Sequence, residues 1–351
     1  MSFSKKINQF RRTITRSLTH KIGFSSTFDA KNRTIQPAEI KTVLISRPNG
    51  RVGNLLLITP LLQEITATFP NCTIDVLVKG SVAPIVFKNY TNIGDLISLP
   101  GKPFKQLGTY LGIWYSLRKK KYDVAINVDF ESSSGRLSTQ FSKATYKFFG
   151  DVSEEIKSNY PDCEHIAKYP IYSLRHSLTQ LGLPENKNAI PNLDLKLSTE
   201  ELELGKEILQ NLVGNDRKTI CVFTYATGEK CLSEVWWNDF YVQLKTQFQS
   251  YNILEILPKE NVSKIDFQAP SFYSNNLREM GAVIANSVVF IGADSGIMHL
   301  ASSVQTPTIG LFSVSKSNKY QPYNAQSVSF DAINQNTGDC IAVVHSILAT
   351  N

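Results

Sequence analysis

Residues 290–312 have the sequence "FIGADSGIMHLASSVQTPTIGLF", and this stretch alone contains the signals of a strand, a turn, a helix and a second strand. An apolar run leads into the glycine-flanked turn 292–296. Apolar side chains then recur at i, i+3, i+4 and i+7 from Ile297 to Val304, which predicts a helix with one buried face. The apolar run 306–312 predicts the next strand. Such a unit builds a parallel sheet with helices packed against it, so the sequence predicts an α/β fold.

Four residues that suit ligand binding gather where this strand becomes a helix: Asp294, Ser295, Gly296 and His299. Asp294 or Ser295 is placed as the N-cap of the helix, and the first turn then keeps unpaired N–H groups. A helix N-terminus beside a glycine attracts anions and suits a diphosphate. His299 lies one turn further on, where it either donates to a phosphate or sugar or makes a structural hydrogen bond to the backbone. We therefore expect a ligand site at this strand end.

The same alternation of strand and helix signals extends over most of the chain. It predicts two Rossmann-like, doubly wound domains that face each other across a cleft, with ligands at the carboxyl ends of the strands. The expected strands are 42–46, 73–78, 95–99 and 122–128 in the first domain and 219–225, 252–257, 288–292 and 306–312 in the second. The expected parts are an N-terminal arm (1–36), a first domain (37–184), a second domain (185–330) and a C-terminal helix (331–351).

Composition places the chain among ordinary globular proteins. Its 351 residues are 42% hydrophobic and 19% charged, and 351 residues are enough for two cores. The apolar runs fall short of the ~20 residues of a membrane-spanning helix. The five cysteines show no C-x-x-C motif and no paired spacing, which favours reduced thiols. These features predict a cytoplasmic protein.

The net charge of +7 is concentrated at the N-terminus. Residues 1–33 contain eight basic side chains and one acid, while the remaining 29 basic and 29 acidic side chains cancel, which argues against nucleic-acid binding. Apolar residues recur at three- and four-residue steps from Phe3 to Leu18, with basic residues on the other side. This pattern predicts that residues 1–24 lie on an anionic membrane surface, at the inner face of the cytoplasmic membrane. A helix packed on its own domain, or a frayed tail, is the alternative.

Four segments together resemble glycosyltransferase family 9, the lipopolysaccharide heptosyltransferases. The run "GADSGIMHLASSVQTPTIGLF" is similar to the family signature G-x-D-[ST]-G-x-x-H-L-A followed by a P-T strand. The other three are "RVGNLLLITPLLQEI" (51–65), "KYDVAINVDFESSSGR" (121–136) and "TYATGEKCLSEVWWNDFYVQL" (224–244). They occur in the family's order, so their combination is far more specific than any one of them.

The resemblance implies a GT-B fold and an inverting, metal-independent sugar transfer. It implies a nucleotide-diphosphate sugar donor in the second domain, ADP-linked as the first expectation, and no required cofactor. The acceptor, a lipopolysaccharide core or another lipid-linked surface glycan, would bind the first domain. The sequence contains no D-x-D, the pattern with which many metal-dependent sugar transferases hold Mg²⁺ or Mn²⁺.

The resemblance also implies roles for individual residues. Lys230 would compensate the charge that builds on the leaving diphosphate, and Glu260 would contact the ribose. The remaining residues implied for donor binding are Thr227, Gly228, Asp294, Ser295, Gly296 and His299, and those implied for the acceptor loop are Gly50, Arg51 and Gly53.

Asn54 stands where the family has an aspartate that is thought to deprotonate the acceptor hydroxyl. An amide orients a hydroxyl but takes no proton at physiological pH. One possibility is that another carboxylate, Asp129 or Glu131, serves as the base. A second is that the reaction is driven by the leaving group and needs little base, since such help is worth about 10²–10⁴-fold. A third is that the protein has kept its donor site and lost transfer.

Two other classes of function remain open beside a glycosyltransferase. A non-catalytic nucleotide-sugar-binding relative, or a scaffold in surface-glycan assembly, is favoured by Asn54. A sugar-nucleotide isomerase on the same paired architecture lacks support at the N-terminal loop.

Overall fold

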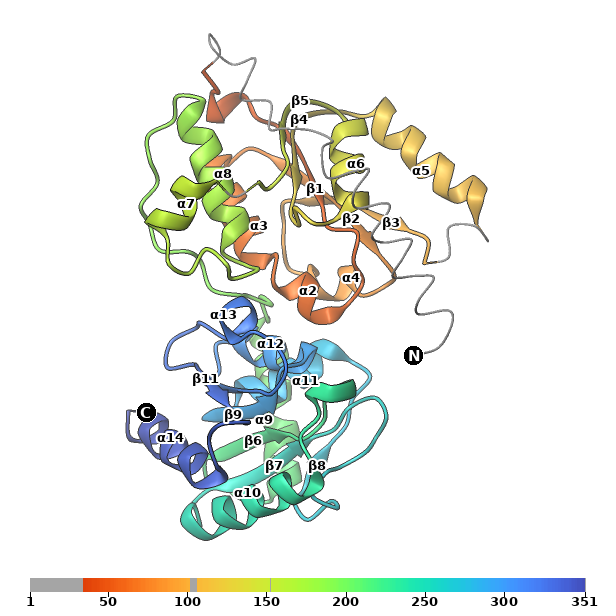
Figure 1. Ribbon diagram of the computed structural model, residues 1–351. Coiled ribbons are helices and arrows are strands. Elements are labelled where there is room, and N and C mark those ends of the chain that lie inside the picture. The colour runs from red at the N-terminus through yellow and green to blue at the C-terminus, as the bar shows by residue number, and fades with distance from the viewer. Residues whose placement is uncertain (1–33, 102–105, 152, 351) are drawn as a thin grey trace, which may run out of the picture. The chain divides into compact units, whose positions relative to one another are not determined.

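Two parallel β-sheets organise the part of the chain that the computed structural model describes, which is residues 34–101, 106–151 and 153–350 (Figure 1). Residues 1–33, which form most of the predicted arm, lie outside this part. Contacts divide the chain into two units, and the longest continuous piece of the second begins at Asn192. Unit 1 contains the chain up to Gly50, Pro60–Pro84 and Tyr90–Pro191, and unit 2 contains Arg51–Thr59, Ile85–Asn89 and Asn192–Asn351.

Unit 1 has a five-stranded parallel sheet in the order β3-β2-β1-β4-β5. The strand order reverses between β1 and β4, so their carboxyl ends form the topological switch point at which doubly wound sheets bind ligands. The strands are β1 (Thr42–Ser46), β2 (Thr73–Lys79), β3 (Ile93–Leu99), β4 (Lys121–Asn127) and β5 (Lys143–Phe148).

Helices of unit 1 pack against this sheet through apolar side chains. One core cluster joins Leu44 and Leu77 of the sheet to Leu117. The described elements are η2 (Pro37–Glu39), α3 (Thr59–Thr68), α4 (Ala83–Val86), α5 (Leu107–Lys119), α6 (Ser133–Phe141), α7 (Glu154–Asn159) and α8 (Tyr169–Gln180).

The apolar run after β1 forms two helices. Helix α2 (Val52–Leu56) ends before Ile58, and α3 begins at Thr59 with Pro60 in its first turn. The Thr59 hydroxyl donates to the Leu56 carbonyl at 2.7 Å. Proline lacks an N–H to donate back along a helix but fits the first turn of a new one, so the chain restarts there.

Unit 2 has a six-stranded parallel sheet in the order β11-β10-β9-β6-β7-β8. Its order reverses between β9 and β6, which gives a second switch point. The strands are β6 (Thr219–Phe223), β7 (Asn252–Ile256), β8 (Ser271–Phe272), β9 (Val289–Ala293), β10 (Thr308–Phe312) and β11 (Val328–Asp331).

Five helices of the described part of unit 2 begin with a side-chain cap. Ser198 and Glu201 form a capping box at the first of them, and Gly214 ends it with a φ of 67°. Trp237 lies in the main core cluster, consistent with a packing role. The described elements are α9 (Thr199–Val213), η4 (Gly228–Lys230), α10 (Glu234–Gln247), α11 (Leu277–Ala285), α12 (Gly296–Ser303), α13 (Ser317–Tyr320) and α14 (Thr337–Ala349).

Helices α9 and α11 pack unusually closely. A Cβ atom on Gly205 would lie 2.4 Å from the backbone carbonyl carbon of Ala282, so only glycine permits this approach. Beside this contact the buried Arg278 binds Glu201 through two hydrogen bonds, Nε to Oε1 at 2.7 Å and Nη2 to Oε2 at 2.6 Å. The hydrogen bonds from Arg278 lower the pKa of Glu201 to about 2.

Among the described residues, the helices are too short or too polar to span a membrane. The five cysteines are free thiols, and four of them are buried.

Candidate functional site

The switch point of unit 2 brings together a lysine and an aspartate from two strand ends. Asp294 follows β9 directly, and Lys230 ends the short turn η4 beyond β6. The Lys230 Nζ donates to Asp294 Oδ2 at 2.5 Å. Asp294 is buried while Lys230 is 39% exposed, so the pair presents its positive end outward. Lys230 Nζ also lies 5.7 Å from the centre of the Tyr320 ring.

Helix α12 begins at this ion pair. Of the two expected caps, Ser295 is the N-cap, and its hydroxyl accepts from the Met298 N–H at 3.3 Å. Gly296 is the first helical residue. An N-cap satisfies only part of the free N–H groups of a first turn, so this helix end keeps donors for an anion.

His299 is buried one turn into the same helix. Burial lowers the pKa of His299 to about 4; the Asp294 carboxylate opposes this shift and the Lys230 ammonium adds to it. The imidazole is therefore neutral at neutral pH and has one N–H to donate and one nitrogen to accept with. It adds hydrogen bonding to the site without adding charge.

The opening glycine loop packs on this helix within unit 2. A Cβ atom on Gly53 would lie 2.8 Å from His299 Cδ2 and 3.3 Å from Gly296 Cα, so a glycine is needed for α2 to approach α12. The neighbouring Asn54 is half-buried on α2. Arg51 is the exposed N-cap residue of α2. The glycine at the loop thus serves close packing of two backbones rather than a tight phosphate turn.

The preceding glycine, Gly50, belongs to unit 1, where its Cβ position would lie 2.5 Å from the Lys79 carbonyl oxygen. It lets the chain leave β1 directly beside the end of β2.

The turn after β6 shows why a glycine stands before the lysine. Gly228 has a φ of 68°, in the left-handed region that favours glycine. Thr227 is the N-cap residue of the 3₁₀ turn, which ends at Lys230. The backbone conformation thus directs Lys230 back to Asp294.

The loop after β7 was expected to supply a ribose contact. Glu260 lies there and is exposed, with its carboxylate 3.9 Å from the Lys259 ammonium. The residue that sequence reasoning missed is Glu255, which is fully buried within β7. Its carboxyl group accepts from the Thr224 hydroxyl at 2.6 Å and from the Ser263 hydroxyl at 2.7 Å, and burial raises its pKa. The signal was one acid within the apolar run "NILEIL".

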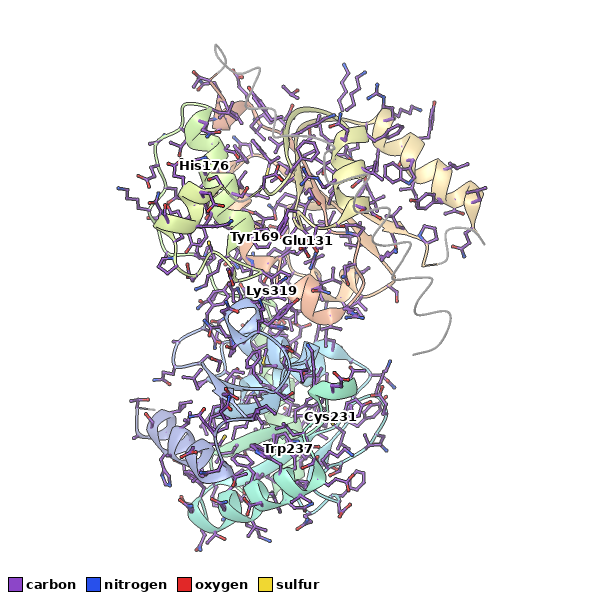
Figure 2. All side chains as sticks on the ribbon, in the orientation of Figure 1. Glu131, Tyr169, His176, Cys231, Trp237 and Lys319 are labelled. Carbon is purple, nitrogen blue, oxygen red and sulfur yellow. The ribbon has the colours of Figure 1, made fainter. Side chains whose placement is uncertain are left out.

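The switch point of unit 1 carries a second ion pair. Asp129 follows the end of β4, and its Oδ2 accepts from Nη1 of the buried Arg47 at 2.7 Å. Asp129 Oδ1 accepts from the Glu131 backbone N–H at 3.1 Å. Glu131 is exposed, and its charge adds to the effect of burial, which raises the pKa of Tyr169; both residues are labelled in Figure 2. Arg47, the residue after the run "TVLIS", was not among the predicted site residues.

Three or more histidine, cysteine, aspartate or glutamate side chains placed to hold a metal ion do not occur together in the described ranges of the chain.

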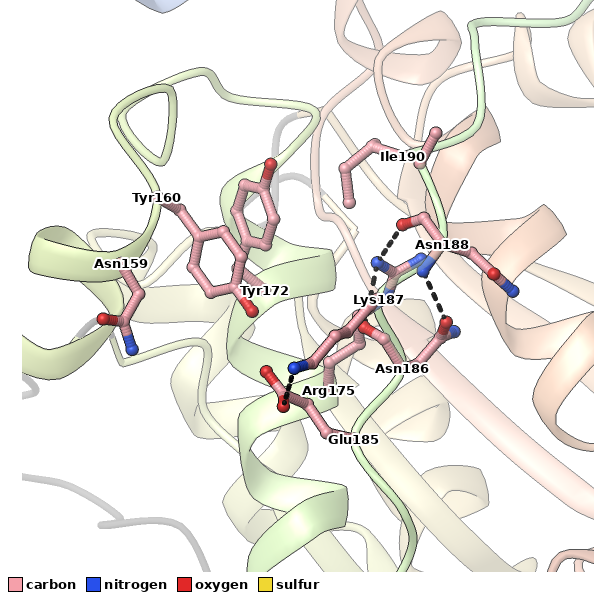
Figure 3. A pocket seen from close by; sticks show the side chains of 10 residues that line it. Asn159, Tyr160, Tyr172, Arg175, Glu185, Asn186, Lys187, Asn188 and Ile190 are labelled. Carbon is pink, nitrogen blue, oxygen red and sulfur yellow. Dashed lines mark hydrogen bonds and ion pairs between the residues drawn. The ribbon is translucent and has the colours of Figure 1, made fainter.

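A pocket of about 430 Å³ lies elsewhere in unit 1, lined by Tyr160, Tyr172 and the segment 185–190 (Figure 3). The two tyrosine rings stack with their centres 4.1 Å apart. The guanidinium of Arg175 is held on the pocket wall by Glu64 and by the Asn188 carbonyl. None of the predicted site residues lines this pocket.

Comparison with known proteins relates the chain to one family. Residues 274–345 match the model of glycosyltransferase family 9 (heptosyltransferase). Lipopolysaccharide heptosyltransferase 3 of Escherichia coli K12 is 23% identical over 303 residues, which cover 80% of this chain and 86% of the relative. These matches confirm the resemblance to glycosyltransferase family 9 that the four sequence segments carry.

Solved structures show the same fold. A glycosyltransferase family 9 protein from Veillonella parvula matches 91% of this chain and 99% of its own with a TM-score of 0.71 at 15% identity. The Escherichia coli heptosyltransferase WaaC, solved with ADP, matches 87% of this chain and 99% of its own with a TM-score of 0.62 at 14% identity. The predicted GT-B class, with two Rossmann-like α/β domains, is confirmed.

Proposed function

Because the chain resembles glycosyltransferase family 9 in sequence and in fold, we propose that it is an inverting, metal-independent glycosyltransferase. It moves a heptose or similar sugar from a nucleotide-diphosphate sugar to a lipopolysaccharide core or another surface glycan. The observation that carries this proposal is the Lys230–Asp294 ion pair at the N-terminal end of α12, on the switch point of unit 2. A cation beside unpaired helix N–H groups suits a diphosphate.

In the proposed reaction, the acceptor hydroxyl oxygen attacks the anomeric carbon from the face opposite the diphosphate. The bond from that carbon to the diphosphate oxygen breaks, and its electron pair stays on the diphosphate. Lys230 and the first turn of α12 stabilise the charge that develops there, which is the part a metal plays in other enzymes. Asp294 holds Lys230 in place, and the neutral His299 completes the hydrogen bonding of the donor.

The acceptor side is proposed to lie along the loop of Gly50, Arg51 and Gly53, with Asn54 orienting the hydroxyl. The proton passes to a carboxylate after β4. Asp129 is held in one pose by Arg47 and by a backbone N–H, which makes it a fixed acceptor group. Glu131, two residues on, is the other candidate base.

The donor base is proposed to be adenine, because the structural relative WaaC was solved with ADP. Thr227 and Gly228 would shape the diphosphate turn and Glu260 would bind the ribose. We also propose that the protein works in the cytoplasm on the inner membrane face. Its basic arm, which lies outside the described residues, would bind anionic lipid there.

The decisive experiment is a thermal-shift titration of the full chain with ADP, UDP, GDP, CMP and NAD. A nucleotide at 100-fold over its Kd stabilises the fold by about 2.7 kcal/mol, a shift of a few degrees for a chain of this size. We expect a selective shift with ADP that Asp294→Ala removes and Asp216→Ala, at an exposed aspartate, retains. An equal shift in melting temperature with all five ligands, or no shift with any of them, would contradict the proposed donor site.

A second candidate, a nucleotide-sugar-binding scaffold without transfer activity, is favoured by Asn54 alone. The two are separated by following ADP release from ADP-heptose in the presence of a lipopolysaccharide-core acceptor, for the native chain and for Asn54→Asp. Transfer by the native chain, or a large gain in the variant, supports the enzyme. ADP binding without turnover in either protein supports the scaffold.

A further inference from the structure

Helix α5 of unit 1 exposes a continuous apolar stripe. Leu107, Leu111 and Tyr115 are spaced at i, i+4 and i+8, so they lie on one side of the helix. They are 54%, 57% and 69% exposed. Tyr110, Ile113 and Leu117 on the opposite side pack into the core. Both sides of this helix are therefore apolar, although a surface helix normally turns charged residues outward.

The stripe continues into neighbouring aromatic side chains. Phe141, at the end of α6, is 44% exposed and packs edge-on against Trp114 with ring centres 5.6 Å apart. Gly108 and Gly112 flank the stripe, and nothing lies within 4 Å of where their Cβ atoms would be. Figure 1 shows α5 beside α6 at the margin of unit 1. We call this surface the α5 face, defined by Leu107, Leu111, Tyr115, Phe141 and Arg118.

Basic side chains outnumber acidic ones around the α5 face, where the exposed Asp95 binds Lys120. Residues 106–122 and 132–150 contain seven basic residues and no acid. Lys120 is bound by Asp75 and Asp95, and Arg136 is bound by Asp151. The other five are Arg118, Lys119, Lys121, Lys143 and Lys147, of which Lys147 donates to the Gln140 carbonyl at 2.7 Å.

These cations are close to one another rather than dispersed. Lys121 of β4 and Lys143 of β5 are direct partners in the sheet register. The guanidinium of Arg118 lies 5.8 Å from the centre of the Phe141 ring. Burial, with a contribution from Arg118, lowers the pKa of Lys147. The cations thus gather at the C-terminal end of the apolar stripe, beside Phe141.

We propose that the α5 face is a docking surface for an anionic lipid bilayer. An apolar strip with aromatic residues and a basic rim is the composition of interfacial membrane elements. Lysine and arginine side chains are attracted to an anionic leaflet, and Leu and Tyr side chains gain from leaving water.

The order of the elements along the chain places one end of the α5 face near the carboxyl edge of the sheet. Helix α5 follows β3 and precedes the parallel strand β4, so its N-terminal end lies toward the carboxyl edge of the sheet. That edge carries Arg47 and Asp129. A bilayer against the α5 face would run alongside the edge at which the proposed function requires a lipid-linked acceptor. The docking itself can be tested without any sugar transfer, so the two proposals can fail separately.

The first test is sedimentation of the full chain with vesicles of phosphatidylglycerol and phosphatidylethanolamine, compared with neutral phosphatidylcholine. We expect the double variant Leu111→Ser, Tyr115→Ser to bind the anionic vesicles at least tenfold more weakly. The matched control is Val235→Ser, Val242→Ser on α10, where both valines are also exposed; it should bind like the native chain. Equal binding by both double variants, or none by the native chain, overturns the proposal.

The second test separates the α5 face from the basic arm, because binding through either gives sedimentation. Tryptophan is placed at the surface in Tyr115→Trp and, as control, in Val235→Trp, and fluorescence is measured with bromine-labelled lipids. We expect the added fluorescence to be quenched at 115 and not at 235. A vesicle-bound protein whose added tryptophan at 115 is not quenched would mean that the arm alone binds or that another segment covers the stripe.

Discussion

His299 lies against the position of Gly53, and its burial has a consequence for stability. The pKa of His299 is about 4 in the fold and about 6.5 in an unfolded chain, so the unfolded chain takes up the proton first as the pH falls. The stabilisation is complete above pH 6.5 and is lost between pH 6.5 and 4. We expect His299→Gln to lose roughly 2–3 kcal/mol less than the native chain between pH 7 and 4.5, measured by urea unfolding. Equal losses would contradict a neutral buried imidazole.

Lys230 is the residue whose charge the proposed reaction uses. Removing one preorganised donor at a site of developing charge typically costs 10²–10³-fold in kcat. We therefore expect Lys230→Ala to lower kcat by about that factor with a smaller change in KM, and Lys230→Arg to retain more of it. Lys259→Ala, at an exposed lysine, is the control. The measurement is the rate of ADP release. A decrease in kcat of less than tenfold would show that Lys230 does not stabilise the leaving diphosphate.

Gly53 tests the packing of α2 on α12. A methyl group there must displace His299 or the Gly296 backbone, so Gly53→Ala should lower the free energy of unfolding by about 1–3 kcal/mol. Gly112→Ala on α5 meets open space and should be neutral or stabilising by up to ~1 kcal/mol. Chemical denaturation of both variants checks this contrast, and an unchanged Gly53→Ala would show that the two helices separate readily.

Sequence alone predicted a set of donor-side residues at one strand end, because strand, turn and helix signals lie within one short stretch. It did not predict Arg47 or Glu255. A basic residue after a strand and a single acid inside one are common patterns, and their importance comes from partners far along the chain. Arg47 meets Asp129, 82 positions away, and Glu255 meets Thr224, 31 positions away.

At the scale of elements, the pair Glu201–Arg278 fixes α9 to α11. Arg278 also donates to the Leu195 and Lys196 carbonyls, so its charge is buried among fixed partners. Glu201→Gln leaves that charge without its counterion and should cost about 3 kcal/mol in the free energy of unfolding. Glu203→Gln on the exposed side of the same helix should change it by less than ~0.5 kcal/mol. Urea unfolding at pH 7 compares the two, and similar costs would contradict a structural role for the pair.

Lowering the pH should remove the stabilisation by the Glu201–Arg278 pair without a mutation. The arginine lowers the pKa of Glu201 to about 2 from an ordinary value near 4.5, so its stabilisation is complete above pH 4.5 and disappears as the pH falls toward 2. The difference in stability between the native chain and Glu201→Gln should therefore narrow over that range.

The strands that sequence reasoning missed lie at sheet edges. Strand β5, "KATYKF", carries two lysines, and β8 and β11 are only two and four residues long. Edge strands are short and charged because exposed hydrogen-bonding edges otherwise attract other chains. The same features erase the apolar run by which the central strands β1, β4, β6 and β9 were predicted.

At the scale of the whole molecule, the two-domain α/β architecture was predicted because buried parallel strands alternate with amphipathic helices along the chain. The assignment of Arg51–Thr59 and Ile85–Asn89 to unit 2 was not. It depends on contacts such as that of Gly53 with His299 and of the Ile85 carbonyl with Arg278, which no local pattern encodes.

These two short segments belong to unit 2 but lie within the sequence of unit 1, so the chain passes between the two units several times. A polypeptide of residues 192–351 expressed alone would lack Gly53 against α12 and the Ile85 carbonyl beside Arg278, so cutting at residue 191 would not yield a self-sufficient half. We expect heating of the intact chain to give one calorimetric transition. Unfolding of unit 1 would release the segments Arg51–Thr59 and Ile85–Asn89 that unit 2 needs. Two well-separated transitions would show that the two units unfold independently in spite of these segments.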